Sequence, residues 1–303
     1  MKKILYFLPL LFVMISCEDV IDVDLPPTES RLVVNGVLRV DVTEEFIPVE
    51  IRVTETSDFF SGNEPTELES AIIIYGTPDP DAPEILDLSP GNGGTSSLAE
   101  VNPGSGIYVP DPTFDEDQRI GIEFARPGIV FILIIEREGR RFAARTTFAP
   151  SIPIDNIEQG TETLFDDDET EVIITVTDNP DQENFYVFDF DFGEFLALDD
   201  QFIDGQEFQF SYFYDNELEP GDTAEISILG ADREFFNYID LIVEQTEDNG
   251  GVFETPAATV RGNVFDVTDL DNIDVFDNVD QPELFALGYF AVVQEFKESI
   301  TIE

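Results

Sequence analysis

The sequence predicts a mainly β protein, built as two β-sandwich-like halves with one helix in the C-terminal half. Three observations predict this fold class. Short segments rich in β-branched and aromatic residues recur along the chain, and turns rich in Pro, Gly, Asp and Asn separate them. Several of these segments alternate apolar and polar residues with a period of two, which is typical of half-buried strands. Helical spacing of apolar residues is clear in one segment, near residues 232–247.

We expect four parts along the chain. Residues 1–16 are predicted to be a lipoprotein signal peptide, and residues 17–30 a lipidated tether that is acidic and carries prolines. Residues 31–150 are predicted to form an N-terminal β-sandwich (Ig-like) domain. Prolines near position 150 mark a natural boundary, so residues 151–303 are expected to form a C-terminal β-rich domain that contains the helix.

The N-terminus has the layout of an export signal. Residues 1–3 are basic, residues 4–15 are apolar, and Ser16 precedes Cys17. The apolar run is roughly a dozen residues, whereas a membrane-spanning helix needs about 20. We therefore expect cleavage between Ser16 and Cys17, with lipid on the Cys17 thiol. The alternative is an ordinary secretory cleavage site that leaves Cys17, the only cysteine, as a plain thiol.

In the N-terminal half, the clearest signal is a β-hairpin. Two apolar runs flank a turn centred on Glu138 and Gly139. A segment dense in Pro, Gly, Asp and Ser, residues 77–106, is expected to be turns and loops, although strand signals lie around Ile85 to Leu88. The strands that we expect in this half lie at 31–39, 47–54, 71–75, 128–135 and 141–148.

In the C-terminal half, aromatic residues alternate with polar ones. The stripe consists of Phe188, Phe190, Phe192, Phe208, Phe210, Tyr212 and Tyr214. We interpret it as the core-facing side of a sheet, and a carbohydrate-stacking platform is the alternative. Further strands are expected at 171–177, 264–267 and 287–293, with a tail at 300–302.

The helix has recognisable ends. Asp232 is a candidate N-cap, and the Asn-Gly-Gly run at 249–251 is a stop signal.

The composition limits the chemistry. The chain has no histidine, which excludes Ser-His-Asp systems and histidine-ligated zinc. Cys17 is assigned to lipid, so we assign no catalytic residue, no cofactor and no metal ligand. Paired carboxylates for glycoside hydrolysis remain available among 66 acidic residues. A formal net charge of −52 would repel phosphate backbones, so nucleic acid is excluded as a partner.

Acidic runs at 166–169, 178–183 and 269–280 are candidates for calcium binding. Residues 200–205 place acids at the first and fifth positions of an EF-hand loop and a glycine at the sixth. The third position is Phe202 and the twelfth is a serine, so the segment fails as an EF-hand. We interpret all of these runs as solvated acidic loops.

Eight short segments follow one another in an order that resembles the Bacteroidota lipoprotein family catalogued as domain of unknown function 4249. They lie at 31–36, 126–128, 141–146, 177–180, 184–186, 235–245, 261–265 and 287–291. The likeness covers nearly the whole mature chain. The segment at 261–265 departs from the pattern, since members often carry Asn-Ile soon after the glycine. Members are typically encoded beside TonB-dependent receptors, and the family provides no catalytic residues to carry over.

The resemblance and Cys17 together predict a non-enzymatic, lipid-anchored accessory protein of a TonB-dependent uptake system, which captures a ligand or caps the receptor. Its expected partners are the outer membrane, through the lipid, and a TonB-dependent receptor. The acidic pair Glu18-Asp19, directly after Cys17, resembles the surface-export signals of Bacteroidota lipoproteins and implies a cell-surface location. The alternative is two solvated acids in a tether. Two alternatives stay open: a calcium-binding structural or adhesive surface lipoprotein, and a carboxylate-based hydrolase.

Overall fold

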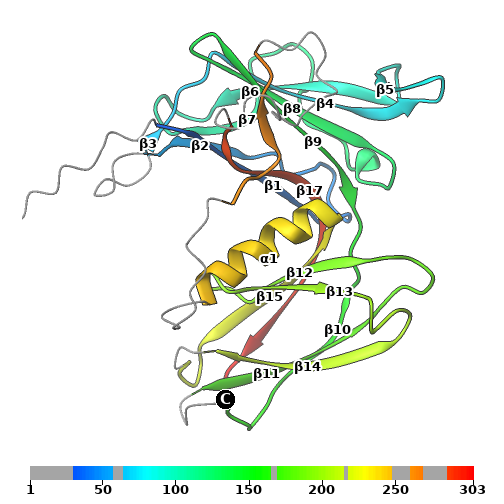
Figure 1. The fold of residues 1–303 in the computed structure, drawn as a ribbon, viewed down its shortest axis with the longest axis vertical. Coiled ribbons are helices and arrows are strands. Elements are labelled where there is room, and N and C mark those ends of the chain that lie inside the picture. The colour runs from blue at the N-terminus through cyan, green and yellow to red at the C-terminus, as the bar shows by residue number, and fades with distance from the viewer. Residues whose placement is uncertain (1–29, 57–63, 165–168, 215–217, 248–259, 269–284) are drawn as a thin grey trace, which may run out of the picture.

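The computed structural model describes residues 30–56, 64–164, 169–214, 218–247, 260–268 and 285–303 (Figure 1). The signal peptide, Ser16, Cys17 and the tether lie outside these residues, as do the acidic run at 269–280 and most of the run at 166–169. Within the described part of the chain, no helix is long and apolar enough to cross a membrane.

The expected mainly β class is confirmed, and the helix lies in the C-terminal half as α1 (Arg233–Glu247). The strands of the first half are β1 (Leu32–Val40), β2 (Ile51–Glu55), β3 (Glu64–Pro65), β4 (Ser70–Asp79), β5 (Ala82–Asp87), β6 (Gly93–Glu100), β7 (Ile107–Pro110), β8 (Val130–Arg137) and β9 (Arg140–Ala149). Those of the second half are β10 (Ile154–Gln159), β11 (Thr170–Thr177), β12 (Phe185–Asp189), β13 (Phe195–Asp199), β14 (Glu207–Tyr214), β15 (Thr223–Ala231), β16 (Val264–Asp266) and β17 (Leu287–Thr301).

The N-terminal half is a closed sheet and not the expected Ig-like sandwich. Its eight strands follow the order β17-β1-β2-β7-β6-β4-β8-β9, and a short parallel pairing of β9 with β17 closes the ring. A sandwich would leave two edge strands unpaired. Here β17 pairs with β1 on one side and with β9 on the other, so the sheet closes. Apolar side chains such as Val34, Ile51, Ile73 and Phe131, all 0% exposed, fill the interior.

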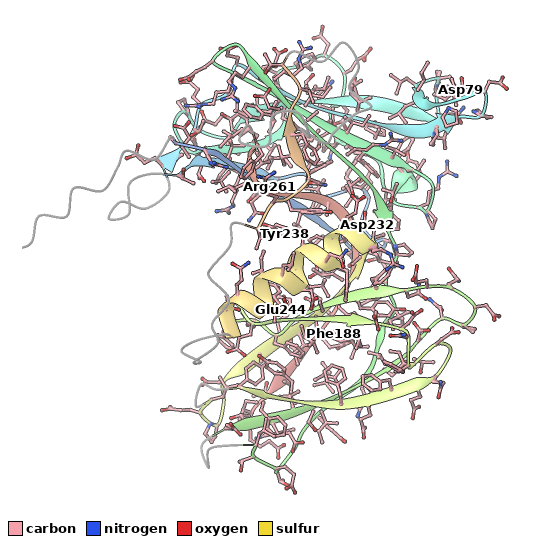
Figure 2. The ribbon with its side chains drawn as sticks, viewed as in Figure 1. Asp79, Phe188, Asp232, Tyr238, Glu244 and Arg261 are labelled. Atoms are coloured by element: carbon pink, nitrogen blue, oxygen red, sulfur yellow. The ribbon has the colours of Figure 1, made fainter. Side chains whose placement is uncertain are left out.

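The C-terminal half has two sheets with a shared core. The order of the first is β13-β12-β15-β17, and that of the second is β10-β11-β14. Both sheets contribute to one apolar cluster, in which Phe188 and Phe190 are 0% exposed. Figure 2 shows Phe188 between the two layers.

With the exception of Phe192, the aromatic stripe therefore belongs to the core. Phe190 stacks on Tyr212 with 3.7 Å between ring centroids, and Phe188 meets Phe210 edge-on at 5.2 Å. The expected alternation ends after Phe190, because the chain turns there and Phe192 takes a φ of 53° and becomes exposed.

Strand β17 belongs to both units. Residues 287–294 pair in parallel with β1, and residues 295–301 pair antiparallel with β15. Figure 1 shows this red strand running from the closed sheet down into the lower layers. The N-terminal unit thus takes in β16 and half of β17, which lie far beyond residue 150 in the sequence.

The hairpin of β8 and β9 forms as expected, with Glu138 and Gly139 at positive φ in its turn. The prediction that residues 77–106 are turns and loops is wrong, because β5 forms over the strand signals near Ile85 and β6 forms where the sequence has no strand signal. Strand β6 has the sequence GGTSSLAE, with little intrinsic strand preference, but it is paired on both sides by β4 and β7. Tertiary pairing overrides local propensity here.

Candidate functional site

Helix α1 lies where the two units meet (Figure 1). One side of the helix packs on β12, β13 and β15. The apolar cluster at this contact also includes Tyr289 and Val37 of the closed sheet. Two cavities adjoin the helix, of about 770 and 590 Å³. Tyr238 and Tyr289 line both of them. We call the larger one the polar cavity, after Arg145 and Arg261, and the smaller one the apolar cavity, after Val37 and its apolar neighbours.

Two residues hold the first turn of α1 in place: Asp232 caps it, and the buried Phe235 packs it against the closed sheet. The Asp232 carboxylate accepts a hydrogen bond from the Phe235 backbone N–H at 2.8 Å, which satisfies one of the free donors of the first turn. The Phe235 side chain, 2% exposed, packs against Tyr289 with 5.1 Å between ring centroids. Tyr238, one turn further along, lies 4.7 Å from the same Tyr289 ring. The tyrosine pair is thereby held at the junction of the two cavities.

The segment before β16 forms another wall of the polar cavity. A Cβ at Gly262 would lie 1.5 Å from the backbone oxygen of Gly288, so only glycine allows this approach. Next to it, the buried Asn263 amide donates to the backbone oxygens of Arg145 and Phe290 and accepts from the Phe290 N–H. The position of Arg261, directly before this pair, follows from these contacts.

The polar cavity concentrates positive charge in a very acidic chain. Arg145, Arg233 and Arg261 line it, three of the eleven arginines (Figure 2 labels Arg261). Arg233 pairs with Glu183 at the surface. Arg145 and Arg261 make no ion pair with any carboxylate of the described residues, although the Arg261 guanidinium lies 4.1 Å over a phenylalanine ring.

The tyrosines of the junction stay neutral. Burial raises the pKa of Tyr289, and the nearby Asp232 and Glu234 raise it further. Burial also raises the pKa of Tyr238 and that of the Asp232 carboxyl. Both phenols therefore remain hydrogen-bond donors at neutral pH.

Two acids, Asp232 and Glu234, line the polar cavity among the described residues. They stand two positions apart at the start of the helix, and residues at that spacing do not face each other. Asp232 is also engaged as the helix cap. Nothing in this arrangement favours the paired carboxylates that a glycoside hydrolase uses.

Four of the segments on which the family resemblance rests contribute to the polar cavity, namely 141–146, 235–245, 261–265 and 287–291. A family model described as a domain of unknown function (DUF4249) matches residues 18–299. The chain belongs to the DUF4249 family. No curated protein matches it.

A second grouping in this DUF4249 chain consists of three aspartates. Asp178, Asp200 and Asp204 come from two acidic segments that the sequence singled out separately, and their carboxylate oxygens lie within 4.8 Å of one another. Asp178 and Asp200 are buried. Burial raises the pKa of Asp200, and the charges of Asp178 and Asp204 add to the effect.

Each of these carboxylates also accepts a backbone hydrogen bond, from Gly205 to Asp178, from Asn184 to Asp200 and from Asp181 to Asp204. The grouping thus organises the loops around β14. It departs from the expected solvated loop, because two of its three acids are inside.

The sequence of this DUF4249 chain did not single out Arg145, Tyr238, Arg261 or Tyr289 as site residues. One signal was available. Arg145 occupies a strand between the buried Ala144 and Thr146, so it points away from the core of the closed sheet. The predicted lipidation residue Cys17 lies outside the described residues and stays a prediction.

Proposed function

We propose that this protein is a non-enzymatic, lipid-anchored accessory protein of a TonB-dependent uptake system, and that it captures a ligand beside α1. The observation that carries the proposal is the pair of cavities at the junction of the two units. Their volumes, about 770 and 590 Å³, fall in the range of about 300–1,000 Å³ that is typical of ligand pockets. Sites at the contact between two structural units are also common.

The side chains of the polar cavity favour binding over chemistry. Arginine, tyrosine, asparagine and threonine dominate it, and the chain has no histidine to act as a base near neutral pH. Lipid on Cys17 would hold this body on the outer membrane, facing the cell surface, since two or more acyl chains anchor firmly. A TonB-dependent receptor is the partner that the family resemblance implies.

The test is a mild-detergent purification of the tagged, lipidated protein from its native outer membrane, followed by mass spectrometry. We expect a TonB-dependent receptor in near-stoichiometric amount. The matched control is Cys17→Ala, which should leave the membrane fraction and lose the receptor. Recovery of the wild-type protein alone from washed membranes would count against the uptake role.

A second candidate function is calcium binding, favoured by the grouping of Asp178, Asp200 and Asp204. Carboxylate oxygens are the ligands that calcium prefers. A bound ion would stabilise the folded state by mass action, so millimolar calcium should raise Tm, and Asp204→Asn should abolish the rise. Asp81→Asn, in an exposed turn, is the matched control. An unchanged Tm of the wild-type chain would exclude this function.

A further inference from the structure

We propose that the two cavities beside α1 bind one amphiphilic organic anion, with its charged group at Arg145 and Arg261 and its apolar body in the apolar cavity. This names the ligand class for the capture role proposed above and rests on that role only for its biological setting. Three features carry it: the pairing pattern of the arginines, the lining of the apolar cavity, and the tyrosines at the junction.

The first feature is which arginines lack a carboxylate partner. Seven arginines form ion pairs with described carboxylates, namely Arg39, Arg52, Arg119, Arg137, Arg140, Arg141 and Arg233. In a chain with 66 acidic residues, pairing is the expected state. Arg126, Arg145 and Arg261 have no such pair among the described residues, and two of these three line the polar cavity.

The chemistry of the guanidinium group identifies the complementary ligand group. Its planar set of donors matches a carboxylate or phosphate in two parallel hydrogen bonds. Arg145 is half-buried, so its charge is partly removed from water. A neutral sugar or a cation would leave that charge uncompensated, whereas an anion satisfies it.

The second feature is the lining of the apolar cavity. Side chains from five strands and the helix meet there, among them Val33, Val37, Phe195, Leu229, Ile239 and Leu287. Arg39 is the one charged residue among its described lining residues, and its guanidinium already pairs with Asp189 and Glu295. The charge of Arg39 is therefore already neutralised within the protein, and this end of the site is apolar toward a ligand. It suits a hydrocarbon or aromatic body of several methylene groups.

The third feature is the junction. Tyr238 and Tyr289 line both cavities, so a ligand that occupies both must pass these two rings (Figure 2 labels Tyr238 and Arg261 on the facing elements). An aromatic ring provides an apolar face to the ligand body and a hydroxyl donor to its polar end. The cationic lining and the apolar lining thus lie on either side of the same two rings, and together they match the two ends of an amphiphilic anion.

The experiment is isothermal titration of the chain from residue 17 onward, carrying Cys17→Ala, which contains every described residue. The probes are decanoate and decanol, which share an apolar body and differ in the anionic group. We expect decanoate to bind at least about tenfold more tightly than decanol, because a charge-assisted hydrogen bond is lost in the alcohol.

The variants separate the two ends of the site. Arg145→Gln with Arg261→Gln should reduce decanoate affinity to that of decanol and leave decanol binding unchanged. Arg126→Gln removes an arginine outside both cavities that has no ion pair with a described carboxylate, so it should change neither affinity. Ile239→Asn should weaken both probes, with thermal unfolding used to verify that the variant folds.

Three results would overturn the proposal: no binding of either probe, equal affinity of the wild-type chain for both, or an equal loss in Arg126→Gln and in the double variant. Receptor co-purification is a separate measurement. Decanoate binding without a receptor would leave the ligand class standing and remove the uptake role, and a receptor without decanoate binding would do the reverse.

Discussion

The Asn263 side chain makes hydrogen bonds to backbone groups of two strands, as a neighbouring strand would do with its own backbone. Its amide bonds to both backbone groups of Phe290 and to the oxygen of Arg145, so it connects β17 with β9 at a point where those strands do not pair. The side chain is 7% exposed, and an amide with both oxygen and nitrogen is the natural choice for such a bridge.

Asn263→Leu should lower the free energy of unfolding by about 2 to 3 kcal/mol, because the buried N–H and C=O of Phe290 lose their partner. Urea denaturation measures the change. Asn179→Ala, at an exposed position, is the control and should have almost no effect. A loss below about 0.5 kcal/mol for Asn263→Leu would mean that water replaces the amide.

Glu171 is a buried carboxylate whose charge is held by hydrogen bonds. The Ser211 hydroxyl donates to it at 2.5 Å, and the Glu162 backbone N–H donates at 2.8 Å. These bonds lower the pKa of Glu171 from its usual 4.5. A lowered folded-state pKa contributes stability above the unfolded pKa, and that stability is lost as the pH falls through the folded pKa.

Ser211→Ala should therefore raise the pKa of Glu171 toward 4.5, as measured by NMR titration of its carboxyl carbon. The variant should be less stable than wild type at pH 7, and the difference should disappear well below pH 4.5. Ser299→Ala, on an exposed part of β17, is the control. An unchanged pKa of Glu171 would show that the Glu162 N–H is sufficient.

The location of a single residue could be predicted from the sequence where its hydrophobicity alone determines whether it is buried. Phe188 and Phe190 were expected in the core, because alternation with aspartate leaves only one apolar face. Arg145 could not be predicted as a site residue, since a charged residue on an outward strand position is usually solvated. Only the distant helix, which covers that face, makes Arg145 part of a cavity.

At the scale of elements, local signals predicted α1 and the hairpin of β8 and β9. Asp232 as a cap and the spacing of Phe235 and Ile239 are contained within one short stretch of sequence. Strand β6 was missed because its glycines and serines carry no strand preference. Its ladder depends on neighbours that are distant in the sequence.

Asp232→Ala should cost about 1 kcal/mol of stability through the loss of the cap, as measured by urea denaturation. Asp232→Asn is the matched variant. Its side-chain oxygen can still accept from Phe235, and it avoids a carboxylate whose pKa is raised by burial, so it should be at least as stable as wild type at pH 7. Equal losses in the two variants would show that the charge, and not the cap, is the stabilising group.

At the scale of the whole molecule, the sequence predicted two β units but not how they join. Residues 33–40 pair with residues 287–294, and no local pattern indicates a partner so far along the chain. The same pairing turns the expected N-terminal sandwich into a closed sheet. Long-range parallel pairing is determined by the complete fold and is invisible to periodicity.

Because β17 is part of both units, we expect them to unfold in a single transition. Hydrogen exchange at increasing urea should give the same opening free energy for amides of β4, in the closed sheet, and β11, in the lower layers. Phe296→Ala, which removes a side chain packed in the lower core, should reduce protection in both strands equally. Loss of protection in β11 alone would show that the units are independent.

The shared strand also sets the order in which the molecule can be completed. Among the described strands, β1 has no partner on one edge before β17 pairs, and β9 is paired on the matching edge only with the short β16. Such edges invite pairing with other chains. We therefore expect the chain to associate with other copies until β17 has paired, and we expect deletion of β17 to destabilise both units.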